Sequence, residues 1–177
     1  MILRLLAAAA LLFAAAAHPP RQAADEARAK ELLAQVAGTW DTQTTFMSFP
    51  PSKGTETVEL LPHGLSAVVT AKGPMGPGLT FEGHGLIGYD PQQKKWMHAW
   101  VDNTDSSFSV SEGTWSADGK VFTIEEEADL GAGPTRMLMQ TTITSADSHS
   151  FRMVPKDAPA DAKPMISTTY TRHGATR

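Results

Sequence analysis

Two hydrophobic patterns meet near residue 38 of the chain. Before it, Ala29, Leu32, Leu33 and Val36 recur every three or four residues, a spacing that places apolar side chains on one face of a helix. This pattern predicts a short helix over residues 25–36. After it, Thr, Val, Phe, Trp and Tyr become frequent and turn signals recur about every ten residues, which is typical of short β-strands.

The second part of the chain contains about ten candidate strands separated by turn sequences. Ala117-Asp118-Gly119-Lys120 and Ser145-Ala146-Asp147-Ser148 suit tight hairpins, and Pro50-Pro51 cannot donate hydrogen bonds to a sheet. The predicted strands span residues 39–49, 54–61, 64–72, 79–89, 94–103, 107–116, 120–128, 135–145, 148–155 and 164–172.

Short connections between so many strands favour an all-β fold, an antiparallel up-and-down β-barrel with one short N-terminal helix. Closure of the barrel removes the unpaired strand edges. We therefore predict a spacer and helix at residues 18–37 and a barrel domain at residues 38–173, with the helix plugging or flanking one end. The alternative is a two-sheet sandwich with Greek-key crossovers, which would need longer connections.

Residues 1–17 have the features of a secretory signal peptide. Arg4 gives a positive start, Leu5 to Ala17 is uninterrupted apolar sequence, and Ala15 and Ala17 form a small-x-small cleavage pattern. We expect a periplasmic or secreted bacterial protein that has no stable membrane insertion after cleavage. An uncleaved membrane anchor is the alternative, although the apolar run is short for a bilayer span.

The composition excludes several kinds of site and partner. The chain has 15 Lys and Arg against 19 Asp and Glu, a net charge of −4, and it has no Lys/Arg cluster. This balance argues against nucleic acid as a partner, because a polyanion needs a basic patch. Cysteine is absent, which rules out disulfides, Cys-ligated zinc and a thiol nucleophile. The six His are spread singly, so we predict neither a metal nor a cofactor.

The motif Gly38-Thr39-Trp40, between the predicted helix and the first strand, resembles the Gly-x-Trp start of calycins, the superfamily of lipocalins and fatty-acid-binding proteins. This resemblance implies that Trp40 closes one end of the barrel. It also implies that a basic side chain from the last strand packs over the indole, and Arg172 is the residue placed to do so.

A second resemblance, to the bacterial family DUF1579, covers about residues 33–173. It implies a calycin-like barrel and no particular activity. It is carried by Gly38-Thr39-Trp40-Asp41, Ser52-Lys53-Gly54-Thr55-Glu56, Phe81-Glu82-Gly83-His84-Gly85-Leu86-Ile87-Gly88-Tyr89-Asp90, Trp100-Val101-Asp102, Ser111-Glu112-Gly113-Thr114-Trp115, Asp118-Gly119-Lys120 and Thr169-Tyr170-Thr171-Arg172.

Alternation along the strands identifies a candidate ligand-contacting wall, although it does not decide which face is inside. Two aromatic rings and an imidazole share one strand face, where they offer apolar area and a polar group. Carboxylates and thioethers from other strands could join them. The candidate residues are Trp96, His98, Trp100, Glu82, Glu112, Met137 and Met139.

These residues lead to the hypothesis that the barrel binds a small apolar ligand. No nucleophile elbow, phosphate loop or dinucleotide motif is present. Two alternatives remain open. One is an enzyme that acts on a hydrophobic substrate through a lumen Glu/His pair such as Glu112 with His98. The other is a filled barrel with a structural or interaction role.

The glycines at 83 and 85 predict barrel bending or close backbone approach.

Overall fold

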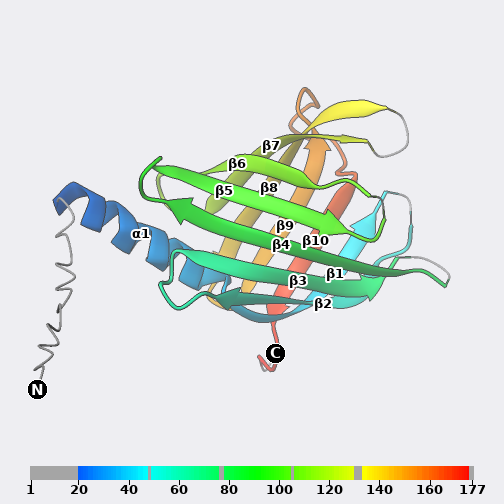
Figure 1. The fold of residues 1–177 in the computed structure, drawn as a ribbon. Helices are drawn as coiled ribbons and strands as arrows, with labels where there is room; N and C mark the ends of the chain where they lie inside the picture. Colours follow the sequence, from blue (N-terminus) through cyan, green and yellow to red (C-terminus); the bar gives the residue numbers. More distant parts are fainter. Residues whose placement is uncertain (1–19, 48, 76–77, 105, 130–132, 176–177) are drawn as a thin grey trace, which may run out of the picture.

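Ten strands follow a single helix and close into one antiparallel barrel (Figure 1). The structure is a computed structural model that describes residues 20–47, 49–75, 78–104, 106–129 and 133–175. Its elements are α1 (Pro20–Val36), β1 (Gly38–Phe46), β2 (Ser52–Leu60), β3 (Ser66–Pro74), β4 (Thr80–Asp90), β5 (Lys95–Asp102), β6 (Ser109–Trp115), β7 (Val121–Asp129), β8 (Pro134–Ser145), β9 (Ser148–Pro155) and β10 (Ile166–Arg172).

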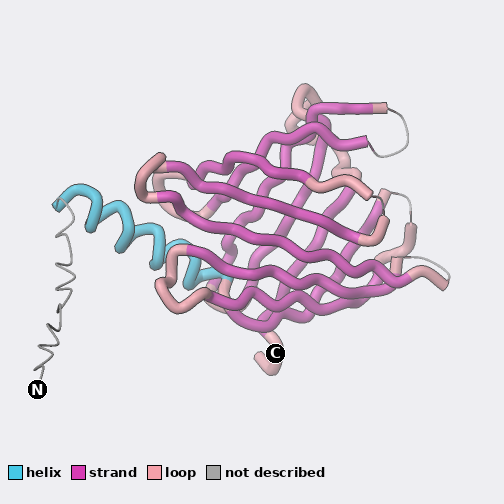
Figure 2. Tube along the Cα trace, in the orientation of Figure 1, coloured by secondary structure: helices cyan, strands magenta, loops and turns pink. Residues whose placement is uncertain are grey.

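Every strand pairs with its neighbours in the chain, and the first strand also pairs with the last. Trp40 of β1 lies opposite Arg172 of β10, and Phe46 lies opposite Ile166. The turns therefore gather at the two ends of the barrel (Figure 2). This arrangement confirms the predicted up-and-down barrel and shows that the sandwich alternative is wrong.

The helix is longer than the apolar pattern indicates. It begins at Pro20 rather than at residue 25, because proline is well suited to a first helical turn and Gln22, Ala23 and Ala24 are compatible with a helix. Among the described residues, no helix is both long and apolar enough to cross a membrane. The predicted signal peptide at residues 1–17 lies outside the described part of the chain.

The apolar stripe of α1 packs against one end of the barrel. Ala29, Leu32, Leu33 and Val36 are buried in one hydrophobic cluster with buried residues of six strands. The Gln35 side chain donates a hydrogen bond to the carbonyl of Gly119 in the β6–β7 turn. This burial, worth roughly 1.5–3 kcal/mol for a large aliphatic side chain, fixes the helix on the barrel. We call this end the floor and the opposite end the mouth.

Inward-facing side chains are packed at the floor and looser toward the mouth. Trp40, Val58 and Trp96 are buried at the floor. Closer to the mouth, Thr44, Phe81 and Trp100 face inward but are only half-buried. A ten-strand barrel is wider than the eight-strand barrels whose interior side chains just fill. These half-buried side chains therefore border the interior of the barrel, which we call the lumen.

Candidate functional site

Three near-parallel rings form one wall of the lumen on β4 and β5. The ring of Trp100 lies between those of Phe81 and His98. Its centroid is 6.4 Å from Phe81 with an interplanar angle of 14°, and 6.2 Å from His98 with an angle of 13°. The Trp100 Nε1 donates a hydrogen bond to Asp102 at 2.9 Å. We call Phe81, Trp100 and His98 the aromatic wall.

Two glycines of β4 make room for the aromatic wall. A Cβ at Gly83 would lie 2.3 Å from the Trp100 ring, and a Cβ at Gly85 would lie 2.7 Å from it. The register places Gly85 directly opposite Trp100 on the inner face. The indole can therefore lie flat against the backbone of β4, so these glycines provide the close approach that the sequence predicted.

His98 brings an uncharged polar ring to the end of the aromatic wall. Burial lowers the pKa of His98, and the nearby Glu126 carboxylate opposes this shift, so the ring is neutral at pH 7. Its Nδ1 is buried without a hydrogen-bond partner, as is the hydroxyl of Ser109. Ser109 lies opposite Trp100 and Ser111 lies opposite His98 in the β5–β6 register. Polar groups that could hydrogen-bond a ligand thus lie beside the aromatic wall, on the side of β6.

The barrel wall opens beside these serines. Strands β6 and β7 pair through only three residue pairs, Gly113 with Ile124, Thr114 with Thr123, and Trp115 with Phe122. Toward the mouth the two strands separate around a hollow of about 510 Å³. The Ser111 hydroxyl, which is almost fully buried, reaches across and donates a 2.7 Å hydrogen bond to Glu126. We call this hollow the side opening. It is lined by Ser107, Phe108, Ser109, Val110, Ser111, Glu112, Glu125, Glu126, Glu127 and Arg136.

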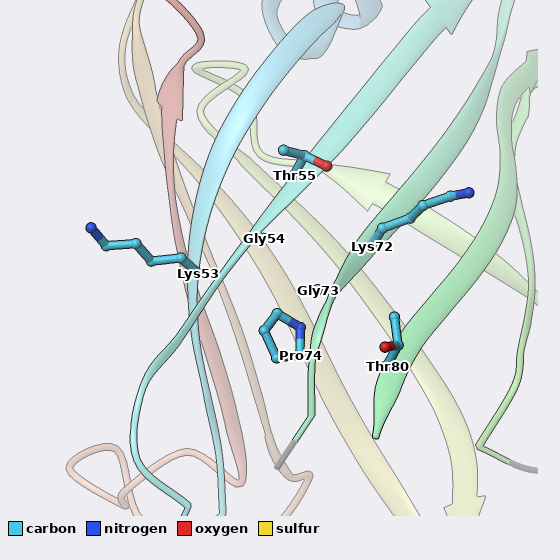
Figure 3. A pocket seen from close by; sticks show the side chains of 7 residues that line it. All are labelled: Lys53, Gly54, Thr55, Lys72, Gly73, Pro74 and Thr80. Atoms are coloured by element: carbon cyan, nitrogen blue, oxygen red, sulfur yellow. The ribbon is translucent and has the colours of Figure 1, made fainter. Parts of the chain in front are cut away.

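A second hollow, of about 410 Å³, lies on β2, β3 and β4 at the mouth rim (Figure 3). Gly54 and Gly73 occupy its centre, and a Cβ on either glycine would lie 3.1 Å from the Cα of the other. Lys53 and Lys72 point away from each other on its two sides. The register places Lys72 opposite Thr55 and Glu82, which are outer-face positions, so this hollow belongs to the outer wall.

At the floor, Arg172 lies over the indole of Trp40. The guanidinium carbon is 4.2 Å from the ring centroid, the arrangement implied by the calycin resemblance. The same guanidinium donates hydrogen bonds to the carbonyls of Ala37 and Ala146, and it pairs with Asp147. The Trp40 Nε1 donates to the carbonyl of Val36 at 2.9 Å. These bonds tie α1, β1 and the β8–β9 turn together.

Above Trp40, Tyr170 contacts two other polar side chains inside the barrel, those of Glu56 and His149. Burial raises the pKa of Glu56 to about 7, and a hydrogen bond with Tyr170 opposes part of that rise. Burial also raises the pKa of Tyr170, as does the Glu56 charge. Burial lowers the pKa of His149 to about 4, and the positive charge of Arg172 adds to this. At neutral pH the imidazole is therefore uncharged and Glu56 is near its midpoint.

Two predicted members of the ligand wall lie on the wrong side of the barrel. Glu112 lies opposite Met97 on the outer face and pairs with Lys95. Glu82 is also outside, where it pairs with Lys72 at 2.8 Å. The proposed Glu112–His98 pair is therefore wrong, because alternate residues of a strand face opposite sides. The carboxylate close to His98 is Glu126, on β7.

The other predicted wall residues face inward but lie at different places. Trp96 is buried at the floor among Tyr89, Trp115 and Phe122, with ring centroids 5.5–6.0 Å from its own. Met137 and Met139 are buried inner-face residues of β8. Whether any of these side chains contacts a ligand stays a prediction.

Sequence reasoning missed Glu56, Glu126 and the contact between Tyr170 and His149. Glu126 lies in a run of three glutamates, where only its β-register marks it as inward-facing. Glu56 could have been recognised from its alternation with Val58, a β2 residue of the apolar face. Within the described residues, no three His, Asp or Glu side chains gather as a metal ion would require.

Comparison with known proteins gives a family and a fold. The S-type phycobiliprotein lyase CPES from Guillardia theta has a similar structure, with a TM-score of 0.54, 10% identity, and coverage of 89% of this chain and 100% of that one. A redesigned β-barrel, b11L5F_LGL, matches with a TM-score of 0.43, 16% identity, and coverage of 82% and 95%. No curated protein matches in sequence. The model of the family described as "Protein of unknown function (DUF1579)" matches residues 25–172, and the chain belongs to that family.

Proposed function

We propose that this protein binds a small, flat, apolar ligand inside the barrel, against the aromatic wall. The observation that carries the proposal is the ring stack of Phe81, Trp100 and His98, with planes within 14° of parallel on an inner face that is half-buried. Stacked rings offer a flat surface to a further ring, an interaction worth about 0.5–1.5 kcal/mol beyond the area buried.

The way the wall is built also favours a ligand over simple packing. Buried core residues contact neighbours on all sides. Trp100, in contrast, faces inward with glycines behind it and is only half-buried. The partial exposure of inward residues argues against the filled-barrel alternative. The likeness to the phycobiliprotein lyase concerns the fold, so the proposal rests on this chain's own side chains.

A fluorescence titration with Nile red, a flat uncharged dye, tests the proposal. Wild-type protein should bind the dye, and Trp100→Leu should weaken binding about tenfold, because the ring surface is lost. Val101→Ala, at the neighbouring outward position, is the matched control and should bind as wild type does. Equal affinity in all three proteins would reject the lumen site. Native mass spectrometry of protein purified from its own host should reveal a bound small molecule.

We also infer that the protein is exported and acts in the periplasm or outside the cell. The apolar run from Leu5 to Ala17 and the Ala15-x-Ala17 pattern support this. Intact-mass measurement of protein from the native host should give a chain that begins at His18. A chain that retains Met1 would contradict cleavage and favour the anchor alternative.

A further inference from the structure

The side opening adds a charge preference to the aromatic wall. Going around the barrel interior from Trp100 and His98, the next inward residues are Ser109 and Ser111, and beyond them is Glu126 across the opening. The carboxylate is half-buried and is held by the hydroxyl of Ser111. A molecule lying on the aromatic wall therefore has one edge toward a fixed negative charge.

The surroundings leave this negative charge without a matching cation on the inner face. Arg172 is the one Lys or Arg residue at an inward position of the described strands. It lies at the floor, where its guanidinium already donates hydrogen bonds to two carbonyls and pairs with Asp147. His98 carries no charge at pH 7 because burial lowers its pKa. Arg136, at the side opening, lies opposite Glu127 on the outer face.

The other carboxylates at the side opening differ from Glu126. Glu125 and Glu112 face outward and pair with Lys156 and Lys95 respectively. Glu126 faces inward beside the aromatic wall. A positive charge placed there would be attracted both by the carboxylate and by the faces of the rings.

We infer that the lumen ligand is a flat organic cation, whose ring system stacks on Trp100 and whose positive charge is recognised by Glu126 at the side opening. This inference rests on the proposed lumen function and refines the ligand from an apolar molecule to an apolar ring system that carries a positive charge. Ser111 positions the carboxylate, and the unpartnered His98 Nδ1 and Ser109 hydroxyl provide polar contacts beside it. The separation of β6 and β7 gives the charged edge access to solvent.

A pair of dyes that differ in charge tests the inference. Acridine at pH 8 is flat and uncharged, and 10-methylacridinium has the same ring system with a fixed positive charge and no N–H donor. Wild-type protein should bind 10-methylacridinium about tenfold more tightly than acridine. Glu126→Gln keeps the shape and an acceptor for Ser111 but removes the charge, so it should abolish this preference and leave acridine affinity within about twofold.

Glu125→Gln is the matched control, because it makes the same chemical change one residue away on the outer face, and it should keep the preference. Thermal unfolding shows whether Glu126→Gln folds as wild type does. If it folds poorly, Glu126→Lys is the second variant, and it should bind acridine but not 10-methylacridinium. Equal binding of both dyes, or a preference that survives Glu126→Gln, overturns the inference and leaves the lumen proposal standing. Binding of neither dye overturns both.

Discussion

The imidazole of His149 lies face to face with the ring of Tyr170, with centroids 4.1 Å apart and planes inclined by 14°. The edge of the same imidazole meets Trp40, at 4.3 Å and 83°. Tyr170 is also the residue that hydrogen-bonds Glu56. A neutral imidazole and a carboxyl of raised pKa thus both contact the Tyr170 side chain in the lumen. Because both pKa values are shifted by folding, both groups should make stability depend on pH.

The two groups should act on stability in opposite directions. The pKa of Glu56 is raised from 4.5 to about 7, so between these values the folded chain keeps a proton that the unfolded chain has lost, and stability falls as pH rises. The pKa of His149 is lowered from 6.5 to about 4, so between these values the unfolded chain binds a proton that the folded chain rejects, and stability rises with pH.

Removing either group should reveal the pH dependence that the other one hides. In Glu56→Gln, the free energy of unfolding should rise by about 2.4 kcal/mol from pH 4 to 6.5, relative to wild type. In His149→Phe, which keeps a ring against Tyr170, it should fall by about 2.4 kcal/mol from pH 4.5 to 7, relative to wild type. Urea unfolding at half-unit pH steps measures both. Curves that run parallel to wild type would show that neither carboxyl nor imidazole is perturbed.

Arg172 should contribute to stability through its fixed contacts at the floor. Arg172→Met removes the charge over Trp40 and the bonds to the carbonyls of Ala37 and Ala146, and we expect a loss of about 2 kcal/mol in the free energy of unfolding. Arg152→Met is the control, because Arg152 bonds Gln140 on the outer face and should cost less than about 1 kcal/mol. If urea unfolding shows the same loss of free energy of unfolding for both variants, the contacts of Arg172 at the floor add no more stability than an outer-face hydrogen bond.

Gly85 should be intolerant of even one added methyl group. In Gly85→Ala the new Cβ would lie 2.7 Å from the Trp100 ring, so the indole must move off the β4 backbone. We expect a loss of about 1–3 kcal/mol in stability, together with weaker Nile red binding. Leu86→Ala changes the exposed outer position next to it and should leave dye affinity unchanged. If Gly85→Ala leaves both the tryptophan fluorescence spectrum of the protein and its affinity for Nile red unaltered, the indole of Trp100 does not lie against the β4 backbone.

The placement of Glu112 outside the barrel can be checked directly. Glu112→Gln breaks an exposed ion pair with Lys95, so it should cost less than about 1 kcal/mol and should not change the affinity for either acridine dye. A large loss of dye affinity, measured by fluorescence titration, would return Glu112 to the lumen and reverse the assignment of faces on β6.

The fold was predictable because its signals are local. Hairpin sequences such as Ala117 to Lys120 fix strand ends and antiparallel pairing, and the spacing of Leu32, Leu33 and Val36 marks the buried helix face. The early start of α1 at Pro20 was missed because residues 20–24 carry no apolar stripe.

The site was harder to predict because it depends on which face of each strand is inside. Trp96, His98 and Trp100 alternate with Met97 and Ala99, and both sets are largely apolar, so hydrophobicity does not separate them. To place Glu82 and Glu112 correctly, one also had to know which face of β4 and which face of β6 points inward. The contacts of Glu56 with Tyr170 and of Ser111 with Glu126 join strands through register, which no single strand encodes.

A crystal structure of the protein soaked with 10-methylacridinium tests the account most directly. It should show the ring system inside the barrel, parallel to Trp100 and beside His98, with its charged nitrogen toward Glu126. A dye molecule bound on the outer wall, or a lumen filled by side chains with no room for the dye, would contradict the proposal that this barrel binds a ligand.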